Sequence, residues 1–151
     1  MKAHTPSIVR TASEGDLPAL EKLFFEFSKW KLQRTESIRK ALRNPNEELL
    51  VASSDNQVIA FLHQVFYNDP LHAGPCSSIT SLFVKEQYRR KGVASQLLKK
   101  ALETAKSRNV IETHVTTRED NSTAIEFYGN RDFTRVGILF EINPWDSGSC
   151  I

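Results

Sequence analysis

The sequence predicts an α/β domain built on a mixed β-sheet, and three observations support this prediction. Apolar residues recur with the period of about 3.6 residues that is typical of amphipathic helices in some segments, and form short strand-like runs in others. Two of the strand-like runs form a hairpin, whereas others are separated by a helix, which favours strands of both directions in one sheet. Neither an internal repeat nor a Pro/Gly-rich linker divides the 151 residues, so we expect one domain over residues 1–151, with residues 147–151 as a flexible tail.

The first third of the chain predicts one strand and two helices. Residues 7–11 fit a short strand, and a helix opens at Asp16 because Pro18 is tolerated in a first helical turn. A second helix over residues 36–43 ends at Asn44, since a residue that precedes proline is disfavoured in the helical region. The first helix carries apolar residues at helical spacing, namely Leu17, Leu20, Leu23, Phe24 and Phe27.

The middle of the chain predicts a hairpin and then a strand that leads into a helix. Residues 49–53 and 58–66 are strand-like, and the polar residues between them predict an antiparallel turn. Residues 68–75 are expected to form a loop, and residues 79–84 a further strand. The next helix, residues 93–108, has one apolar face made by Val93, Leu97, Leu98, Ala101, Leu102 and Ala105.

The C-terminal part predicts a strand at 110–117, a helix at 121–129 and a final strand or hairpin at 133–142. The expected order of elements is therefore β-α-α-β-β-β-α-β-α-β.

Composition argues against several classes of protein. The formal net charge of +2 does not indicate nucleic-acid binding, and neither a helix-turn-helix glycine turn nor an aromatic RNA-binding signature is present. No segment approaches the ~18 uncharged apolar residues of a membrane span, so we expect a soluble, cytoplasmic protein that does not bind a membrane. Cys76 and Cys150 have neither CxxC spacing nor a histidine at ligand spacing, so no disulfide framework and no metal site are expected.

The most informative segment is the predicted strand-to-helix junction at residues 79–95. A helix start presents unpaired N–H groups and partial positive charge, which favours phosphate binding. Gly92 and Ala94 would let a diphosphate approach the backbone, next to Arg89, Arg90 and Lys91. Neither a Walker A loop nor a G-x-G-x-x-G fingerprint is present. A tight turn with solvated cations is the alternative interpretation of the same residues.

This junction resembles the GNAT superfamily of acyl-CoA-dependent N-acetyltransferases, whose signature Arg/Gln-x-x-Gly-x-Gly/Ala matches residues 89–94. The resemblance covers about residues 8–142. It implies a mixed, mostly antiparallel central sheet of six or seven strands flanked by about four helices. It includes further spaced residues: Val9, Arg10, Thr11, Ala12, Asp16, Leu17, Asn121, Ala124, Phe127, Tyr128 and Phe133.

The resemblance implies an activity and a set of binding residues. The expected reaction transfers the acetyl group of acetyl-CoA to a primary amine of a small molecule or peptide, by direct attack in a ternary complex and without a metal. Asn121 would bind the pantetheine arm, and Asp132 departs from the glycine that the family has before its late phenylalanine. The coenzyme would be held by Leu82, Phe83, Val84, Arg89, Arg90, Lys91, Gly92, Val93, Ala94, Ser95, Asn121 and Tyr128.

Amine acetylation needs an acid, an oxyanion donor and a base. By resemblance Tyr128, with an ordinary pKa near ~10, suits the acid that protonates the leaving thiolate. A backbone N–H of Phe83 or Val84 suits the oxyanion if the strand bulges there. The base stays open between Glu112 and His114, which share one strand face, the strand residue His63, and a chain of water molecules. Thr80 and Ser81 stand where many relatives have a carboxylate.

The acceptor and the assembly are less determined by the sequence. Residues 29–43 hold six cations against Glu36 alone, which favours a neutral or acidic amine over a polyamine, unless this is simply a solvated helix face. The resemblance also leaves a homodimer open. A non-catalytic, acetyl-CoA-binding regulatory protein is the alternative function.

Overall fold

A computed structural model describes residues 6–141 of the chain. The chain divides into two compact units, Met1–Val115 and Thr116–Ile151. The expected single domain is not tested by this division, and residue 142 and the tail at 147–151 lie outside the described residues.

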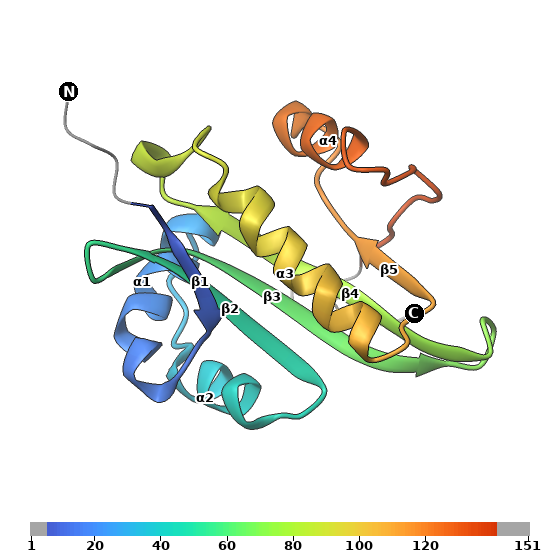
Figure 1. The fold of residues 1–151 in the computed structure, drawn as a ribbon, viewed down its shortest axis with the longest axis horizontal. Helices are drawn as coiled ribbons and strands as arrows, with labels where there is room; N and C mark the ends of the chain where they lie inside the picture. The colour runs from blue at the N-terminus through green and yellow to red at the C-terminus, as the bar shows by residue number, and fades with distance from the viewer. Residues whose placement is uncertain (1–5, 142–151) are drawn as a thin grey trace, which may run out of the picture. The chain divides into compact units, whose positions relative to one another are not determined.

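The first unit is built on a five-stranded sheet with the strand order β1-β2-β3-β4-β5 (Figure 1). The first four strands pair antiparallel, and β5 pairs parallel to β4. The predicted mixed, mostly antiparallel sheet is therefore confirmed. The strands are β1 (Ile8–Thr11), β2 (Glu47–Ser54), β3 (Gln57–Asp69), β4 (Gly74–Val84) and β5 (Glu112–Val115).

Helices cover both faces of this sheet. On one face, α1 (Leu17–Ser28) and α2 (Thr35–Arg43) share a buried cluster with Leu49, Val51 and Phe61. Side chains alternate across a strand, so the buried residues Leu50, Ala52 and Leu62 point to the other face, where α3 (Val93–Ser107) packs on β2, β3 and β4. Helix α3 is also the crossover that a parallel β4–β5 pair requires. Between residues 6 and 141 no helix combines the length and the apolar character needed to cross a membrane.

The two hairpins of the sheet differ in how well local sequence predicts them. At the first, Asp55 and Asn56 adopt left-handed backbone angles (φ 49° and 61°), as a tight polar turn requires. At the second, β3 continues to Asp69 and β4 begins at Gly74, so the loop expected at 68–75 is confined to residues 70–73 and its two ends are strand. Pairing across the sheet outweighs the weak strand propensity of these polar residues and prolines.

An ion pair between the exposed Arg10 and the buried Asp16 joins β1 to the start of α1. The Arg10 guanidinium donates to both carboxylate oxygens of Asp16, at 2.7 and 2.8 Å, and Ser13 N donates to the same carboxylate at 2.8 Å. These contacts lower the pKa of Asp16 to about 2, chiefly through the bonds from Arg10. The carboxylate is therefore ionised in the folded protein at neutral pH and fixes the entry into α1.

The second unit contains α4 (Ser122–Gly129), whose N-terminus is capped by Asn121 Oδ1, which accepts from Ala124 N at 3.1 Å. The final strand predicted at 133–142 is wrong over its described part, residues 133–141, and the sheet has five strands instead of six or seven. Apolar, β-branched residues predict a strand, but a strand forms only where a neighbour accepts its backbone hydrogen bonds. Within the described chain no ladder pairs with this segment, and Val136, Ile138, Leu139 and Phe140 are exposed.

Candidate active site

The residues predicted to hold a diphosphate meet at the junction between β4 and α3. The chain leaves the sheet at Val84, passes through a short 3-10 turn at Glu86–Tyr88, and enters α3 at Val93. Gly92 is the residue before the helix and has φ 80°, a left-handed conformation that glycine adopts at little cost. The predicted segments 82–84 and 89–95 therefore lie at one junction of the first unit.

The start of α3 has the geometry of an anion site. Gln96 N donates to Gly92 O at 3.0 Å, so the amides of Val93 and Ala94 precede the first turn's hydrogen bond. A Cβ atom added at Gly92 would meet no other atom within 4 Å, so no neighbouring group fills the space beside this residue. Partial positive charge at this end of the helix favours a negatively charged ligand.

Two of the three cations at the junction also brace its loop. Arg89 Nε donates to Val84 O at 2.9 Å, and the guanidinium carbon lies 5.5 Å from the centre of the Phe83 ring. Lys91 Nζ donates to Gln87 O at 2.9 Å. Arg90 is exposed and has φ 57°. The junction therefore carries formal charge on a loop whose shape is fixed by the same side chains.

Strand β4 pairs with β3 along its whole length on one edge, whereas on the other edge it pairs with β5 only as far as Ile79. Lys85 N donates to Ile59 O, and the register pairs Val84 with Ala60. The alternation of an antiparallel ladder then turns the N–H of Phe83 toward β3 and that of Val84 away from it. Strand β5 pairs only with residues 76–79, so the Val84 amide lies on an edge that β5 does not cover.

A bulge in β4 places His63 in a polar contact chain. The register shifts between His63, opposite Ser81, and Gln64, opposite Ile79, which leaves Thr80 as the extra residue. His63 Nδ1 lies 2.6 Å from Thr80 Oγ1, and Nε2 lies 2.8 Å from Glu47 Oε2. The bulge thus falls at Thr80, earlier than the expected position at Phe83 or Val84. The sequence indicates His63 as a candidate base, but it does not indicate Glu47, because only the β2–β3 register brings Glu47 beside His63.

An open pocket of about 500 Å³ lies over this part of the sheet, between α1, α2, β2 and β3. Its apolar wall includes Phe24, Ile38 and Leu49. The pocket is also lined by the cations Arg34 and Lys40, the carboxylate of Glu47 and the imidazole of His63. It is therefore a candidate site for a small, polar molecule beside the imidazole.

The cationic character predicted for residues 29–43 is partly neutralised. Arg39 and Arg43 pair with Glu14 at 3.4 and 2.8 Å, and Arg39 pairs with Glu36 at 3.0 Å. Arg34 donates to Ser28 Oγ at 2.7 Å. Glu14 lies outside residues 29–43, so the charge count of that segment did not include its carboxylate.

The other two base candidates, Glu112 and His114, lie at a different part of the sheet. Their side chains meet, with His114 Nε2 3.0 Å from Glu112 Oε1, as two residues on one strand face should. Glu112 pairs with Cys76, eight residues before Val84 on β4, which corresponds to about 25 Å at ~3.3 Å per residue. Within this unit the pair faces the β3–β4 turn and not the start of α3.

The second unit holds Tyr128 on α4. Its ring lies between those of Phe127 and Phe133, with centroid separations of 5.1 and 5.4 Å, and burial raises its pKa to about 12. Asp132, which stands where the family has a glycine, adopts φ 64°, a left-handed conformation that glycine adopts at less cost. Phe133 N donates to Tyr128 O at 3.2 Å and closes that turn.

Comparisons with known proteins agree with this architecture. The profile of the acetyltransferase (GNAT) family matches residues 16–133. No curated protein matches the chain.

Among solved structures, three similar ones illustrate the fold. A transcriptional regulator from Bacillus halodurans C-125 is 21% identical with a TM-score of 0.84, over 91% of this chain and 99% of that one. Aminoglycoside N-acetyltransferase AAC(6')-Iy, solved with CoA, is 15% identical with a TM-score of 0.85, over 95% and 99%. Aminoglycoside acetyltransferase meta-AAC0020, from an uncultured soil metagenomic sample and solved with trehalose, is 20% identical with a TM-score of 0.77, over 91% and 94%. With the family profile spanning most of its length, the chain belongs to the acetyltransferase (GNAT) family.

Proposed function

We propose that this protein is an N-acetyltransferase that transfers the acetyl group of acetyl-CoA to a primary amine of a small molecule or peptide, by direct attack in a ternary complex. The observation that carries the proposal is the open start of α3 beside Arg89, Arg90 and Lys91. A diphosphate group matches that combination of amides and cations.

The residues of the junction fit coenzyme A as the group that they hold. Gly92 adds no side chain at the helix start, and in this proposal the diphosphate would bind the amides of Val93 and Ala94. When bound, acetyl-CoA supplies an acetyl group activated as a thioester. The Val84 N–H, directed away from β3, is a better donor to the carbonyl oxygen of that group than the Phe83 N–H, which the sheet uses.

His63 is the base that we infer, acting through Thr80. Because the Glu47 carboxylate can only accept, it fixes the proton of His63 on Nε2 and leaves Nδ1 to accept from the Thr80 hydroxyl. A proton from the amine can pass to Thr80 Oγ1 while the hydroxyl proton passes to Nδ1. Glu47 then stabilises the imidazolium. In this proposal the relay takes the role of the carboxylate that many relatives have at this position. It lies nearer to the Val84 end of β4 than Glu112 or His114 does.

Tyr128 is the acid in this proposal, as the resemblance to the family implies. Its pKa is raised to about 12 by burial, so the phenol keeps its proton at neutral pH and can donate it to a departing thiolate. Asn121 keeps its expected role toward the pantetheine arm only through groups other than Oδ1, which caps α4.

The pocket between α1, α2, β2 and β3 is the acceptor site that we infer. Glu47 would attract the substrate ammonium, while Arg34 and Lys40 favour a neutral or acidic group elsewhere on the same molecule. Two of the structurally similar proteins are aminoglycoside acetyltransferases, so polycationic amines are the main competing substrate class.

A panel of amines tests the proposal. Acetyl-CoA is mixed with amino-acid amides, short peptides, sisomicin and spermidine, and the released thiol is measured. We expect turnover with amino-acid-like amines and a loss of about 100-fold or more in Tyr128→Phe, with CoA affinity unchanged. Saturating turnover with sisomicin or spermidine alone would contradict the acceptor assignment. Thermal stabilisation by CoA without any acetylated product would identify the protein as a non-catalytic binder.

A further inference from the structure

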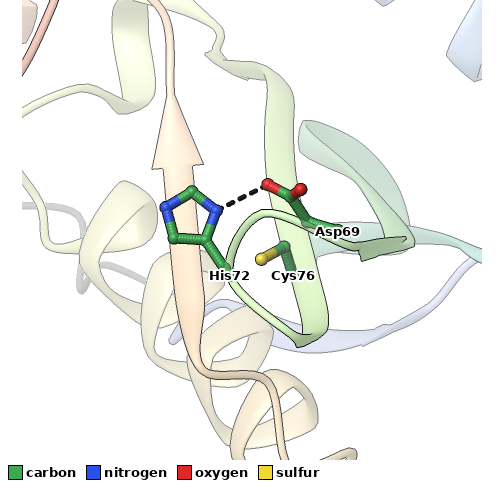
Figure 2. Close-up of side chains that lie close together, drawn as sticks. All are labelled: Asp69, His72 and Cys76. Carbon is green, nitrogen blue, oxygen red and sulfur yellow. Dashed lines mark hydrogen bonds and ion pairs between the residues drawn. The ribbon is translucent and has the colours of Figure 1, made fainter.

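A cluster of metal-binding side chains lies at the turn of the β3–β4 hairpin, away from the acetyl-transfer junction. Asp69 is the last residue of β3, His72 lies in the turn, and Cys76 lies on β4. One ligand atom from each residue lies within 4.8 Å of the other two. Figure 2 shows the Cys76 sulfur and a His72 nitrogen directed toward the space beside the Asp69 carboxylate.

We propose that Asp69, His72 and Cys76 form a zinc-binding site. Thiolate sulfur, imidazole nitrogen and carboxylate oxygen are the three ligand types that Zn²⁺ takes in proteins. His72 Nδ1 now lies 2.5 Å from Asp69 Oδ2, whereas two such ligands on one tetrahedral zinc lie about 3.4 Å apart for bonds of ~2.1 Å. A shift of about 1 Å in the exposed His72 ring would provide this separation. Water would occupy the fourth position.

The surroundings of His72 support a site built for a metal. When Nδ1 binds a metal, Nε2 carries a proton, and a carboxylate commonly accepts it and orients the ring. Glu112 Oε2 lies 3.1 Å from His72 Nε2, and its other oxygen contacts His114 Nε2. His114 Nδ1 in turn lies 3.1 Å from Tyr67 Oη. A hydrogen-bonded chain therefore holds the ring from the side opposite the proposed metal.

Cys76 is the group that distinguishes this cluster from an ordinary turn. Asp69 Oδ1 also accepts from Leu71 N at 2.9 Å, which by itself is a common way to stabilise a turn. Such a turn needs no sulfur, yet the free thiol of Cys76 is fully buried beside the pair. Coordination would release the thiol proton to solvent and give the buried sulfur a partner. The sequence did not predict this site because it offers no CxxC motif.

The metal would connect β3, the turn and β4, and through Glu112 also β5. Cys76 lies about 25 Å from Val84 along β4, at ~3.3 Å per residue, so the zinc would stabilise the hairpin and would not take part in acetyl transfer. The inference therefore goes beyond the proposed function and does not depend on it.

Metal titration of the chelator-treated full chain tests the proposal. Zn²⁺ is added in competition with a chromophoric chelator, and Co²⁺ is added separately to detect a thiolate-to-cobalt charge-transfer band. We expect one equivalent of each metal, a rise in melting temperature with Zn²⁺, and a charge-transfer band that reports Cys76. Glu112→Gln should weaken zinc binding by about 10-fold, since it leaves the ligands in place.

Substitutions of single residues show which side chains bind the zinc. Cys76→Ser should abolish the cobalt band, and His72→Ala, in an exposed turn, should weaken zinc binding by at least about 100-fold even if Cys76→Ser fails to fold. Cys150→Ser, which changes a residue outside the described chain, is the matched control and should keep both signals. Absence of stoichiometric binding in the wild type, or loss of the band in Cys150→Ser, overturns the proposal. Binding of CoA to each variant shows independently whether the junction is intact.

Discussion

At one end of the β3–β4 hairpin the chain turns into α3, and at the other end it reverses between Asp69 and Gly74. The first end combines three cations, a helix start and a glycine that leaves open space. The second end combines carboxylates, imidazoles and a buried thiol. The same two strands thus present groups suited to an anion at one end and groups suited to a cation at the other.

The difference shows what the long strands do for this molecule. Strand β4 separates the two ends by about 25 Å at ~3.3 Å per residue, which is well beyond the ~8 Å over which physiological salt screens charge. Each end can therefore be changed without altering the electrostatics of the other. His63, at the bulge, lies between them.

The largest expected effect comes from placing a negative charge at the anion end. Gly92→Asp should weaken CoA binding by about 200-fold, because two unit charges ~5 Å apart at an effective dielectric constant of ~20 repel by about 3 kcal/mol. Gly92→Asn is the matched control, since asparagine also tolerates a left-handed backbone but adds no charge. Calorimetry with CoA measures both variants. Equal losses in the two would mean that shape and not charge determines binding, and a change in zinc affinity would break the comparison between the ends.

The second effect distinguishes two candidate bases, His63 in the middle of the hairpin and His114 near its turn. His63→Gln should lower kcat by about 100-fold with little change in CoA affinity, because it removes the proton acceptor of the relay. The rival His114→Gln should lower kcat by less than about 3-fold. Steady-state rates over pH 6 to 9 with the best amine of the panel measure both variants. A larger loss of kcat in His114→Gln than in His63→Gln would identify His114 as the base and contradict our assignment.

The third effect concerns Asp16, which lies at neither end of the hairpin. Its substitution should lower the stability of the fold without changing either site. The pKa of Asp16 is lowered from 3.8 to about 2, so its stabilising contribution is complete above pH 4 and is lost as pH falls through 2. Asp16→Asn should lower the free energy of unfolding by about 2 kcal/mol at pH 7, equivalent to about 30-fold in the unfolding equilibrium. This difference should shrink between pH 4 and pH 2.

Urea unfolding at pH 7 and at pH 2.5 measures this loss. Metal and CoA affinities of the folded Asp16→Asn variant should match those of the wild type, because the Arg10–Asp16 pair joins β1 to α1 and touches neither end of the hairpin. A pH-independent difference in stability would show that the lost bonds and not the ionised carboxylate matter.

The same comparison explains which parts of the molecule could be predicted from sequence. Residues 89–94 are contiguous, so their helix start, glycine and cations could be interpreted together, and the turn at Asp55 and Asn56 is equally local. The contacts of His63 with Glu47 and Thr80 depend on strand register, which a single sequence does not fix. The same applies to the contact between His72 and Glu112. The prediction of a final strand was wrong for the opposite reason. Its local pattern of apolar, β-branched residues was strong, but no strand pairs with its described residues.

The smallest effect tests how the anion end distributes its attraction between backbone and side chains. Arg90 is exposed, and exposed charges typically contribute up to about 1 kcal/mol, so Arg90→Gln should weaken CoA binding by about 3- to 5-fold. The loss should fall further in 0.5 M salt, where the Debye length is short. The Gly92→Asp loss should persist in the same buffer, because that carboxylate would stand against the bound group itself. Were Arg90→Gln to cost as much as Gly92→Asp, the amides of α3 would contribute little, and the anion end would be a cluster of surface charges and not a site formed by the backbone.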